Sequence, residues 1–228
     1  MPAAGSGSRF GAAVPKQYAP LLGRTVIEWA LAPFLADPQC AGIVVALAPG
    51  DALWPQVAAR LPGSILTVDG GAHRSGSVLN GLDGLAGRAA ARDWVLVHDA
   101  ARPCLPAGDL ARLLQTMSEE ETGGLLAAAG ADTLKFATAA DPVHVERTVD
   151  RTGLWRALTP QMFRCSALRT ALQAAHDTGR IPTDESQALE WQGARPRLVA
   201  GSAANLKVTT AQDLVVAAAI LRSRDGTS

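Results

Sequence analysis

Gly42-Ile-Val-Val-Ala-Leu-Ala48, followed by Pro49-Gly50, is the stretch that decides the fold. It is a continuous apolar run of strand length that ends at two turn residues. Such a run is typical of a strand in a parallel sheet, because helices cover both faces of a parallel sheet and leave neither to water. We therefore predict a buried parallel strand here.

Strand and helix patterns alternate along the chain on both sides of this run. Helical periodicity is expected in the segments that separate the apolar runs, beginning with a helix capped by Thr25. This alternation predicts βαβ units, and hence an α/β fold with a mostly parallel sheet flanked by helices. The further strands are expected at 64–68, 93–97, 124–129, 158–163 and 197–200, and the helices at 26–35, 51–60, 78–86, 110–117, 166–176, 184–191 and 214–221.

Residues 131–151 break this alternation. Thr133-Leu-Lys-Phe-Ala137 and Val143–Val149 each alternate in polarity, and Asp141-Pro142 lies between them. The pattern is typical of a β-hairpin with polar faces, which on its own has little stability in water. We predict an arm that projects from the core and contacts a partner chain.

The composition limits the class of protein. We expect one domain, residues 1–228, with the arm inserted in it. Lys+Arg and Asp+Glu are both 21, so the total charge attracts neither nucleic acid nor an anionic membrane. Three widely spaced cysteines form no disulfide framework and no CxxC metal pair. Because we also expect no membrane span and no signal peptide, we predict a cytoplasmic protein.

The first sixteen residues are typical of a loop that holds phosphate groups. The glycines of Pro2-Ala-Ala-Gly-Ser-Gly-Ser-Arg9 let backbone N–H groups approach phosphate oxygens, and Arg9 and Lys16 add cations. The loop is not a Walker A sequence, because no Gly-Lys-Ser/Thr follows. It is a poor dinucleotide fingerprint, because the third glycine is missing and Pro15 interrupts the following helix. Taken alone, the stretch is equally consistent with a flexible terminal tail.

Two further polar loops follow predicted strands. Asp69-Gly70-Gly71 ends one strand, and His98-Asp99 ends another. Because ligands bind beyond the carboxyl ends of parallel strands, we expect these loops to converge. Asp99 can hold a hard cation together with phosphate oxygens, or it can be a turn or helix-cap residue.

The neighbouring polar residues have alternative readings. We expect His98 to be structural and Arg74 to be an ion-pair partner, while Arg102 binds substrate phosphate, pairs with Asp99, or does both. Asp184 and Glu185 either cap the following helix or belong to the site.

Several motifs together are similar to those of one enzyme family. They are Pro2–Arg9, Pro15–Tyr18, Asp69–Gly71, Arg74 with Ser77, Val97–Pro103, Thr183–Glu185 and Asn205–Thr209. In this order and spacing, over nearly the whole chain, they resemble the 2-C-methyl-D-erythritol 4-phosphate cytidylyltransferases of the non-mevalonate isoprenoid pathway. The resemblance implies a Rossmann-like fold, a homodimer locked by the β-arm, and Mg²⁺-dependent transfer of CMP from CTP to 2-C-methyl-D-erythritol 4-phosphate with release of pyrophosphate.

The resemblance also implies roles for individual residues. The implied catalytic residues are Arg9, Lys16, Asp99 and Lys207, and Asp99 is the implied Mg²⁺ ligand. The implied nucleotide-binding residues are Ala3, Ala4, Gly5, Gly7, Arg9, Lys16, Gly71, Ala72, Ser77 and Ala100. The implied substrate-binding residues are Asp99, Arg102, Thr133, Arg151, Thr159 and Lys207, of which Thr133 and Arg151 on the arm reach the partner's active site.

Two features depart from the family pattern. The family has an apolar strand directly before Pro-Ala-Ala-Gly, whereas this sequence starts at Met1, so we expect that the N-terminal strand is truncated and that the natural start lies upstream. Ala72 stands at a frequently acidic position, so any side-chain contact there is lost, although the backbone could still read the base.

The implied chemistry requires positioning and charge neutralisation more than proton transfer. The nucleophile is a phosphate oxygen that is already ionised, so a general base has little to do. Two alternatives stay open. One is a related nucleotidyltransferase that acts on another alditol phosphate or a sugar phosphate. The other is a regulatory module that binds a dinucleotide, which Pro15 and the missing glycine disfavour.

Overall fold

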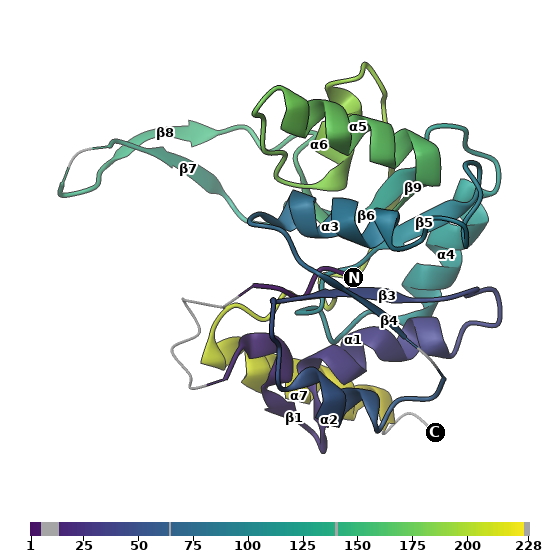
Figure 1. Ribbon diagram of the computed structural model, residues 1–228. Helices are drawn as coiled ribbons and strands as arrows, with labels where there is room; N and C mark the ends of the chain where they lie inside the picture. The colour runs from purple at the N-terminus through teal and green to yellow at the C-terminus, as the bar shows by residue number, and fades with distance from the viewer. Residues whose placement is uncertain (6–13, 64, 140, 226–228) are drawn as a thin grey trace.

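The core strands form two groups in a computed structural model that describes residues 1–5, 14–63, 65–139 and 141–225 (Figure 1). One group is a four-stranded sheet with the order β10-β6-β9-β5. Its strands are β10 (Arg197–Ala200), β6 (Gly124–Ala129), β9 (Trp155–Arg164) and β5 (Trp94–Val97). β6 and β10 are parallel, whereas β9 is antiparallel to both of its neighbours. The predicted α/β fold is therefore confirmed, with one reversed strand inside the sheet.

The second group is the parallel pair β3 (Val44–Leu47) and β4 (Leu66–Asp69). Pro2 forms a parallel bridge with Ala46, where the N–H of Ala3 donates to the Ala46 carbonyl at 2.7 Å. Within the described residues, no ladder joins β3 to β5. All four residues of β3 are buried, as the apolar run predicted. The truncated N-terminal strand stays a prediction.

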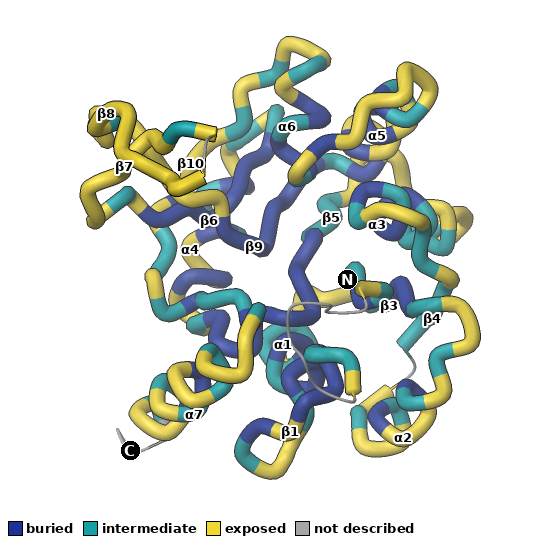
Figure 2. Tube along the Cα trace, turned by 90° about the vertical axis from the view of Figure 1, so that its left-hand side faces the viewer, coloured by how far each residue is buried: buried dark blue, intermediate teal, exposed yellow. Residues whose placement is uncertain are grey.

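Helices cover both faces of the strands. α3 (Arg74–Asp83), α5 (Cys165–Asp177) and α6 (Glu185–Glu190) pack with β5 and β9 into one core cluster. On the other face, α1 (Val26–Leu35) and α2 (Trp54–Ala58) pack on β3, and α4 (Ala107–Met117) packs on β6 and β9. The last helix, α7 (Ala211–Asp225), packs against α1. Figure 2 shows the buried strands running between these layers.

The predicted element boundaries hold to within a few residues, with two differences. α2 is shorter than expected, and β9 begins at Trp155 rather than near Leu158. A small hairpin of β1 (Pro20–Leu21) and β2 (Arg24–Thr25), after the 3-10 turn η1 (Lys16–Tyr18), was not expected. Positive φ angles of 47° and 76° at Leu22 and Gly23 form its tight turn.

The predicted arm is the antiparallel pair β7 (Leu134–Ala137) and β8 (Val145–Val149), which projects away from the other elements in Figure 1. Its apolar side chains are largely exposed, with Phe136 at 48% and Val145 at 63%. Among the described helices, none is long and apolar enough to span a membrane.

Candidate active site

A cavity of about 200 Å³ opens where the loops after several strands converge. It lies beyond the carboxyl ends of β4 and β5, at the edge where the sequence predicted a site. The lining residues are Pro2, Ala3, Ala4, Gly5, Lys16, Gln17, Gly71, Ala72, His73, Arg74, Ser77, Asp99, Ala100, Ala101 and Lys207.

The turn between β4 and α3 forms one wall, and its shape requires glycine. A Cβ on Gly70 would lie 2.3 Å from the Ala4 Cβ, and a Cβ on Gly71 would lie 2.8 Å from the Gly76 carbonyl carbon. The N–H of Gly71 donates to the Ser77 hydroxyl, which donates to the His73 carbonyl. The Ser77 hydroxyl therefore links the backbone of Gly71 to that of His73 and stabilises the turn.

The N-terminal segment lies directly beside this turn and also lines the cavity. The buried Gln17 side-chain amide donates to the Ala3 carbonyl at 2.7 Å, so it joins the segment before the glycine loop to the turn that carries Lys16. The Tyr18 hydroxyl donates to Asp51 at 2.8 Å and anchors the same turn from outside. Sequence analysis did not single out Gln17, although it lies inside the quoted Pro15–Tyr18 motif.

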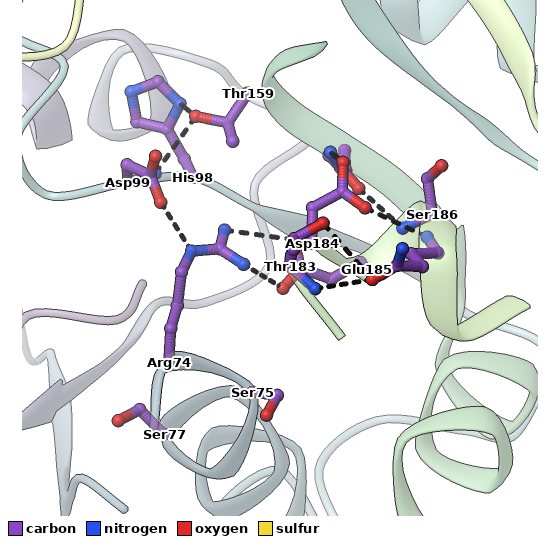
Figure 3. A network of polar contacts seen from close by, with 12 residues as sticks. Arg74, Ser75, Ser77, His98, Asp99, Thr159, Thr183, Asp184, Glu185 and Ser186 are labelled. Carbon is purple, nitrogen blue, oxygen red and sulfur yellow. Dashed lines mark hydrogen bonds and ion pairs between the residues drawn. The ribbon is translucent and has the colours of Figure 1, made fainter. Parts of the chain in front are cut away.

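Asp99 is surrounded by three positively charged side chains, of which Figure 3 shows Arg74. Its Oδ1 accepts from Arg74 Nε at 2.9 Å, while its Oδ2 lies 2.9 Å from Lys207 Nζ and 3.4 Å from Arg102 Nε. Burial by itself raises the pKa of Asp99, but the three cations outweigh burial and hold that pKa well below its ordinary value. Asp99 is therefore ionised near pH 7.

Arg74 connects Asp99 to a second carboxylate. Its Nη1 and Nη2 reach Glu185 Oε1 and Oε2 at 2.5 and 3.1 Å. Burial lowers the pKa of Arg74, but Glu185 and Asp99 more than reverse this and raise it. Burial raises the pKa of Glu185, which Arg74 partly offsets. The predicted ion-pair role of Arg74 is confirmed, and Asp184 rather than Glu185 caps α6 by accepting from the Gln187 N–H.

A hydrogen-bonded chain holds the Asp99 backbone. The N–H of Asp99 donates to the Thr159 hydroxyl at 3.1 Å, which lies 2.9 Å from His98 Nδ1. His98 Nε2 lies 3.2 Å from the Arg102 carbonyl, which can only accept, so Nε2 carries the proton and Nδ1 accepts from Thr159. Burial lowers the pKa of His98 to about 4, so the ring is neutral near pH 7. This supports the expected structural role of His98.

The structure brings together many of the implied site residues. Those that line the cavity are Ala3, Ala4, Gly5, Lys16, Gly71, Ala72, Ser77, Asp99, Ala100 and Lys207. Arg102 and Thr159 lie directly behind it, and each contacts Asp99. Gly7 and Arg9 lie outside the described residues.

The two implied arm residues are not brought to this cavity by their own chain. Thr133 precedes β7 and Arg151 follows β8, at the base of the arm, and both are exposed. Arg151 Nη1 donates to the Ala131 carbonyl. Neither side chain lines the cavity within its own chain.

The donor set at the cavity fits a magnesium ion that also binds phosphate. Mg²⁺ is commonly held by one or two carboxylates plus substrate phosphates, and Asp99 supplies one carboxylate. Within the described part of the chain, no cluster of three or more His, Cys, Asp or Glu residues forms a complete metal site. A cation at Asp99 would therefore need phosphate oxygens from a bound nucleotide.

A larger hollow of about 410 Å³ lies between α1 and residues 60–62, which follow α2, and it shares no lining residue with the smaller cavity. Its one carboxylate, Glu28, is already paired, because Arg60 Nε and Nη2 each donate to it at 2.9 Å. We therefore assign the candidate site to the smaller cavity.

Known proteins are similar to this chain in sequence. The family model described as 2-C-methyl-D-erythritol 4-phosphate cytidylyltransferase matches residues 1–223. The protein of that name from Pseudomonas aeruginosa PAO1 is 51% identical over 216 residues, covering 94% of this chain and 92% of that protein. The one from Azoarcus sp. BH72 is 49% identical over 228 residues, covering 99% and 94%.

Solved structures agree. A crystal structure of 4-diphosphocytidyl-2C-methyl-D-erythritol synthase has a TM-score of 0.84 and 39% identity, covering 96% of this chain and 95% of that one. The 2-C-methyl-D-erythritol 4-phosphate cytidylyltransferase of Francisella tularensis has a TM-score of 0.82 and 33% identity, covering 96% of each chain. The chain therefore belongs to the 2-C-methyl-D-erythritol 4-phosphate cytidylyltransferase family.

Proposed function

We propose that the protein transfers CMP from CTP to 2-C-methyl-D-erythritol 4-phosphate, giving 4-diphosphocytidyl-2-C-methyl-D-erythritol and pyrophosphate. The observation that carries this proposal is the convergence of the Ala3–Gly5 segment, Lys16, the Gly70–Gly71 turn, Asp99 and Lys207 around one cavity. Family membership supplies the identity of the two substrates.

In the proposed reaction, an acceptor phosphate oxygen attacks the α-phosphorus of CTP. A new phosphorus–oxygen bond forms, the bond to the β-phosphate bridge breaks, and pyrophosphate leaves with the electron pair. No proton has to be removed from the nucleophile, since a phosphate monoester is ionised near pH 7. The buried, neutral His98 accordingly has no transfer to perform.

The protein's main task is to neutralise charge and to align the two phosphates. Lys16 lines the cavity and would face the triphosphate, while Lys207 also lines it and would face the acceptor phosphate. Asp99 would hold Mg²⁺, which supplies positive charge to the nucleotide's phosphate oxygens when it is bound. The Gly70–Gly71 turn lets backbone groups approach the base, where Ala72 adds no polar side chain.

We also propose that the protein works as a homodimer whose arms exchange contacts. The exposed apolar side chains of β7 and β8 support this, because a projecting two-stranded hairpin gains stability from a partner surface. A cytoplasmic setting fits the free thiols of Cys40, Cys104 and Cys165.

Pyrophosphate release tests the proposed function. Purified protein with CTP, Mg²⁺ and 2-C-methyl-D-erythritol 4-phosphate should release pyrophosphate well above an Asp99→Asn control of equal thermal stability. A panel of other alditol and sugar phosphates should give less product. Release from another acceptor alone would favour the related nucleotidyltransferase, and stabilisation by NAD but not by CTP–Mg²⁺ would favour the dinucleotide-binding module.

A further inference from the structure

Arg74 connects the buried Glu185 carboxylate to Asp99, which lines the cavity. We propose that Glu185 is a positioning residue. It holds the forked end of Arg74 away from Asp99, so that Asp99 keeps one oxygen available to a divalent cation that arrives with the nucleotide. This inference rests on the proposed function, because it assigns a role within the same site.

Glu185 is placed where only a fixed partner can satisfy it. It is the first residue of α6, its exposed fraction is 0%, and Arg74 is the cation that it contacts. A buried carboxylate is costly unless it is paired and hydrogen-bonded. The two N–H donors at the forked end of the Arg74 side chain meet both Glu185 oxygens, so this pair is bidentate.

Arg74 consequently reaches Asp99 with one donor only. Figure 3 shows its side chain rising from α3 between the two carboxylates. Its Nε donates to Asp99 Oδ1 at 2.9 Å, while its two Nη atoms remain on Glu185. The orientation of the Asp99 carboxylate is thereby fixed through Oδ1.

The closer of the two partners of the second Asp99 oxygen is exchangeable, whereas the more distant one, Arg102, is buried and donates to the Asn205 carbonyl. Oδ2 is contacted by Lys207 at 2.9 Å and by Arg102 at 3.4 Å, and the Lys207 side chain is 37% exposed and lines the cavity. A long flexible ammonium group at the rim can move to a phosphate oxygen when a cation takes its place. Arg74, locked to two carboxylates, cannot make that exchange.

Removing the Glu185 charge should therefore change Asp99 and not only the local packing. A freed guanidinium edge pairs best with a carboxylate through two parallel hydrogen bonds, and Asp99 is the carboxylate already in contact. Arg74 would then occupy both Asp99 oxygens. The specific consequence is a weaker link between the divalent cation and the nucleotide.

The link can be measured by calorimetric titration of CTP with and without Mg²⁺. The ratio of the two dissociation constants is the coupling between cation and nucleotide. We expect Mg²⁺ to tighten CTP binding at least about tenfold in the wild type, and by no more than about twofold in Glu185→Gln. CTP binding without Mg²⁺ should stay within about twofold of the wild-type value, because the nucleotide contacts remain.

Glu190→Gln is the matched control. It removes the same charge from the same helix, at an exposed residue whose carboxylate accepts from Ser186 rather than from Arg74. Its ratio should equal that of the wild type. Glu185→Asp keeps the charge but shortens the reach by one methylene, and it should give an intermediate ratio; it carries the test if Glu185→Gln does not fold.

The outcomes separate this inference from the proposed function. A wild-type ratio retained in Glu185→Gln or Glu185→Asp, or CTP affinities that fall equally with and without Mg²⁺, would show that Glu185 only stabilises the fold and would overturn the proposal. A wild type that binds CTP without any effect of Mg²⁺ would overturn it as well. Failure of the wild type to bind CTP at all would instead contradict the proposed function.

Discussion

The cluster around Asp99 and the arm formed by β7 and β8 differ in burial: the cluster buries charged side chains, whereas the arm exposes apolar ones. In the cluster, the carboxylates of Asp99 and Glu185 are buried, and contacts within the chain satisfy them. On the arm, Phe136 and Val145 are about half exposed or more, and all four residues of β7 are exposed. The cluster is complete in one chain, whereas the arm offers a surface that one chain does not cover.

This contrast divides the implied site residues into two groups. Lys16, Asp99 and Lys207 are held at one cavity by their own chain, so their roles can be tested with single variants. Thr133 and Arg151 lie at the base of the arm, so it is the proposed homodimer that assigns them a role, at the cavity of the second chain. Variants on the two sides of this division should behave differently when chains are mixed.

The largest effect is expected for Asp99→Asn. This change keeps the size of the side chain but leaves Arg74, Arg102 and Lys207 without their shared carboxylate. We expect turnover to fall roughly 10²–10³-fold, which is the typical effect of removing a preorganised charge at such a site. Steady-state pyrophosphate release measures the loss. Turnover within threefold of the wild type would show that catalysis does not need the Asp99 carboxylate.

The next largest effect concerns the arm. Arg151→Gln alone should be nearly inactive, because it deprives the partner's cavity of a cation. When Arg151→Gln and Asp99→Asn chains are unfolded and refolded together, each mixed dimer has one intact cavity served by one intact arm. We expect about a quarter of the wild-type activity to return, as random pairing of a symmetric dimer predicts.

Mixing the two variant chains tests whether Arg151 acts on the partner's cavity or within its own chain. Recovery would establish that the arm acts on the other chain. If the mixture is as inactive as its components while each variant forms dimers, Arg151 acts within its own chain and the contrast between the regions fails.

A smaller effect is expected at the turn beside the cavity. An added Cβ at Gly71 would lie 2.8 Å from the Gly76 carbonyl carbon, so Gly71→Ala forces the turn away from α3. We expect a loss of about 1–3 kcal/mol in the free energy of unfolding together with weaker CTP binding. Chemical denaturation and calorimetry measure the two.

Gly81→Ala is the control for this change. Gly81 lies on α3 with nothing within 4 Å of an added Cβ, so alanine there should stabilise the protein by about 0.5–1 kcal/mol. Equal behaviour of the two variants would contradict the tight approach of the turn to α3.

The last prediction is a pH dependence of the free energy of unfolding that arises from the buried His98. Burial lowers the pKa of His98 from 6.5 to about 4, so between these values the unfolded chain binds more protons than the folded one. The free energy of unfolding should therefore fall as the pH drops from 6.5 to 4, by on the order of 3 kcal/mol from this residue. His98→Gln should flatten that slope.

Asp99 does not produce the same slope. Its pKa in the folded protein is depressed, so its contribution is present above its unfolded value of 3.8 and is lost only as the pH falls below that value. Denaturation curves of wild type and His98→Gln across the window isolate His98, and parallel curves would place the titrating group elsewhere.

Much of the fold could be predicted because local patterns and tertiary burial agree. The buried run at Val44–Leu47 and the alternating strands of the arm follow directly from hydrophobic periodicity. The antiparallel direction of β9 could not be predicted, because a strand pattern carries no information on which way its neighbours run. The small hairpin before α1 depends on a positive φ at Leu22, which leucine rarely adopts.

In the site, too, local patterns predicted some features and not others. The Asp69–Gly71 and His98–Asp99 loops could be assigned to one edge, because the carboxyl ends of strands meet there. The pairing of Arg74 with Glu185 joins residues that are 111 positions apart, and no local pattern reports such a contact. Gln17 was missed for a different reason. Its partner is the backbone carbonyl of Ala3, and no side-chain type in the sequence indicates such a contact.

The most direct test of the central claim is a crystal structure with CTP and Mg²⁺. The account predicts the triphosphate between the Ala3–Gly5 segment and Lys16, the cytosine against the Gly70–Gly71 turn, and the cation on Asp99 with Lys207 displaced from Oδ2. A nucleotide bound away from Lys16, or a cation remote from Asp99, would contradict it.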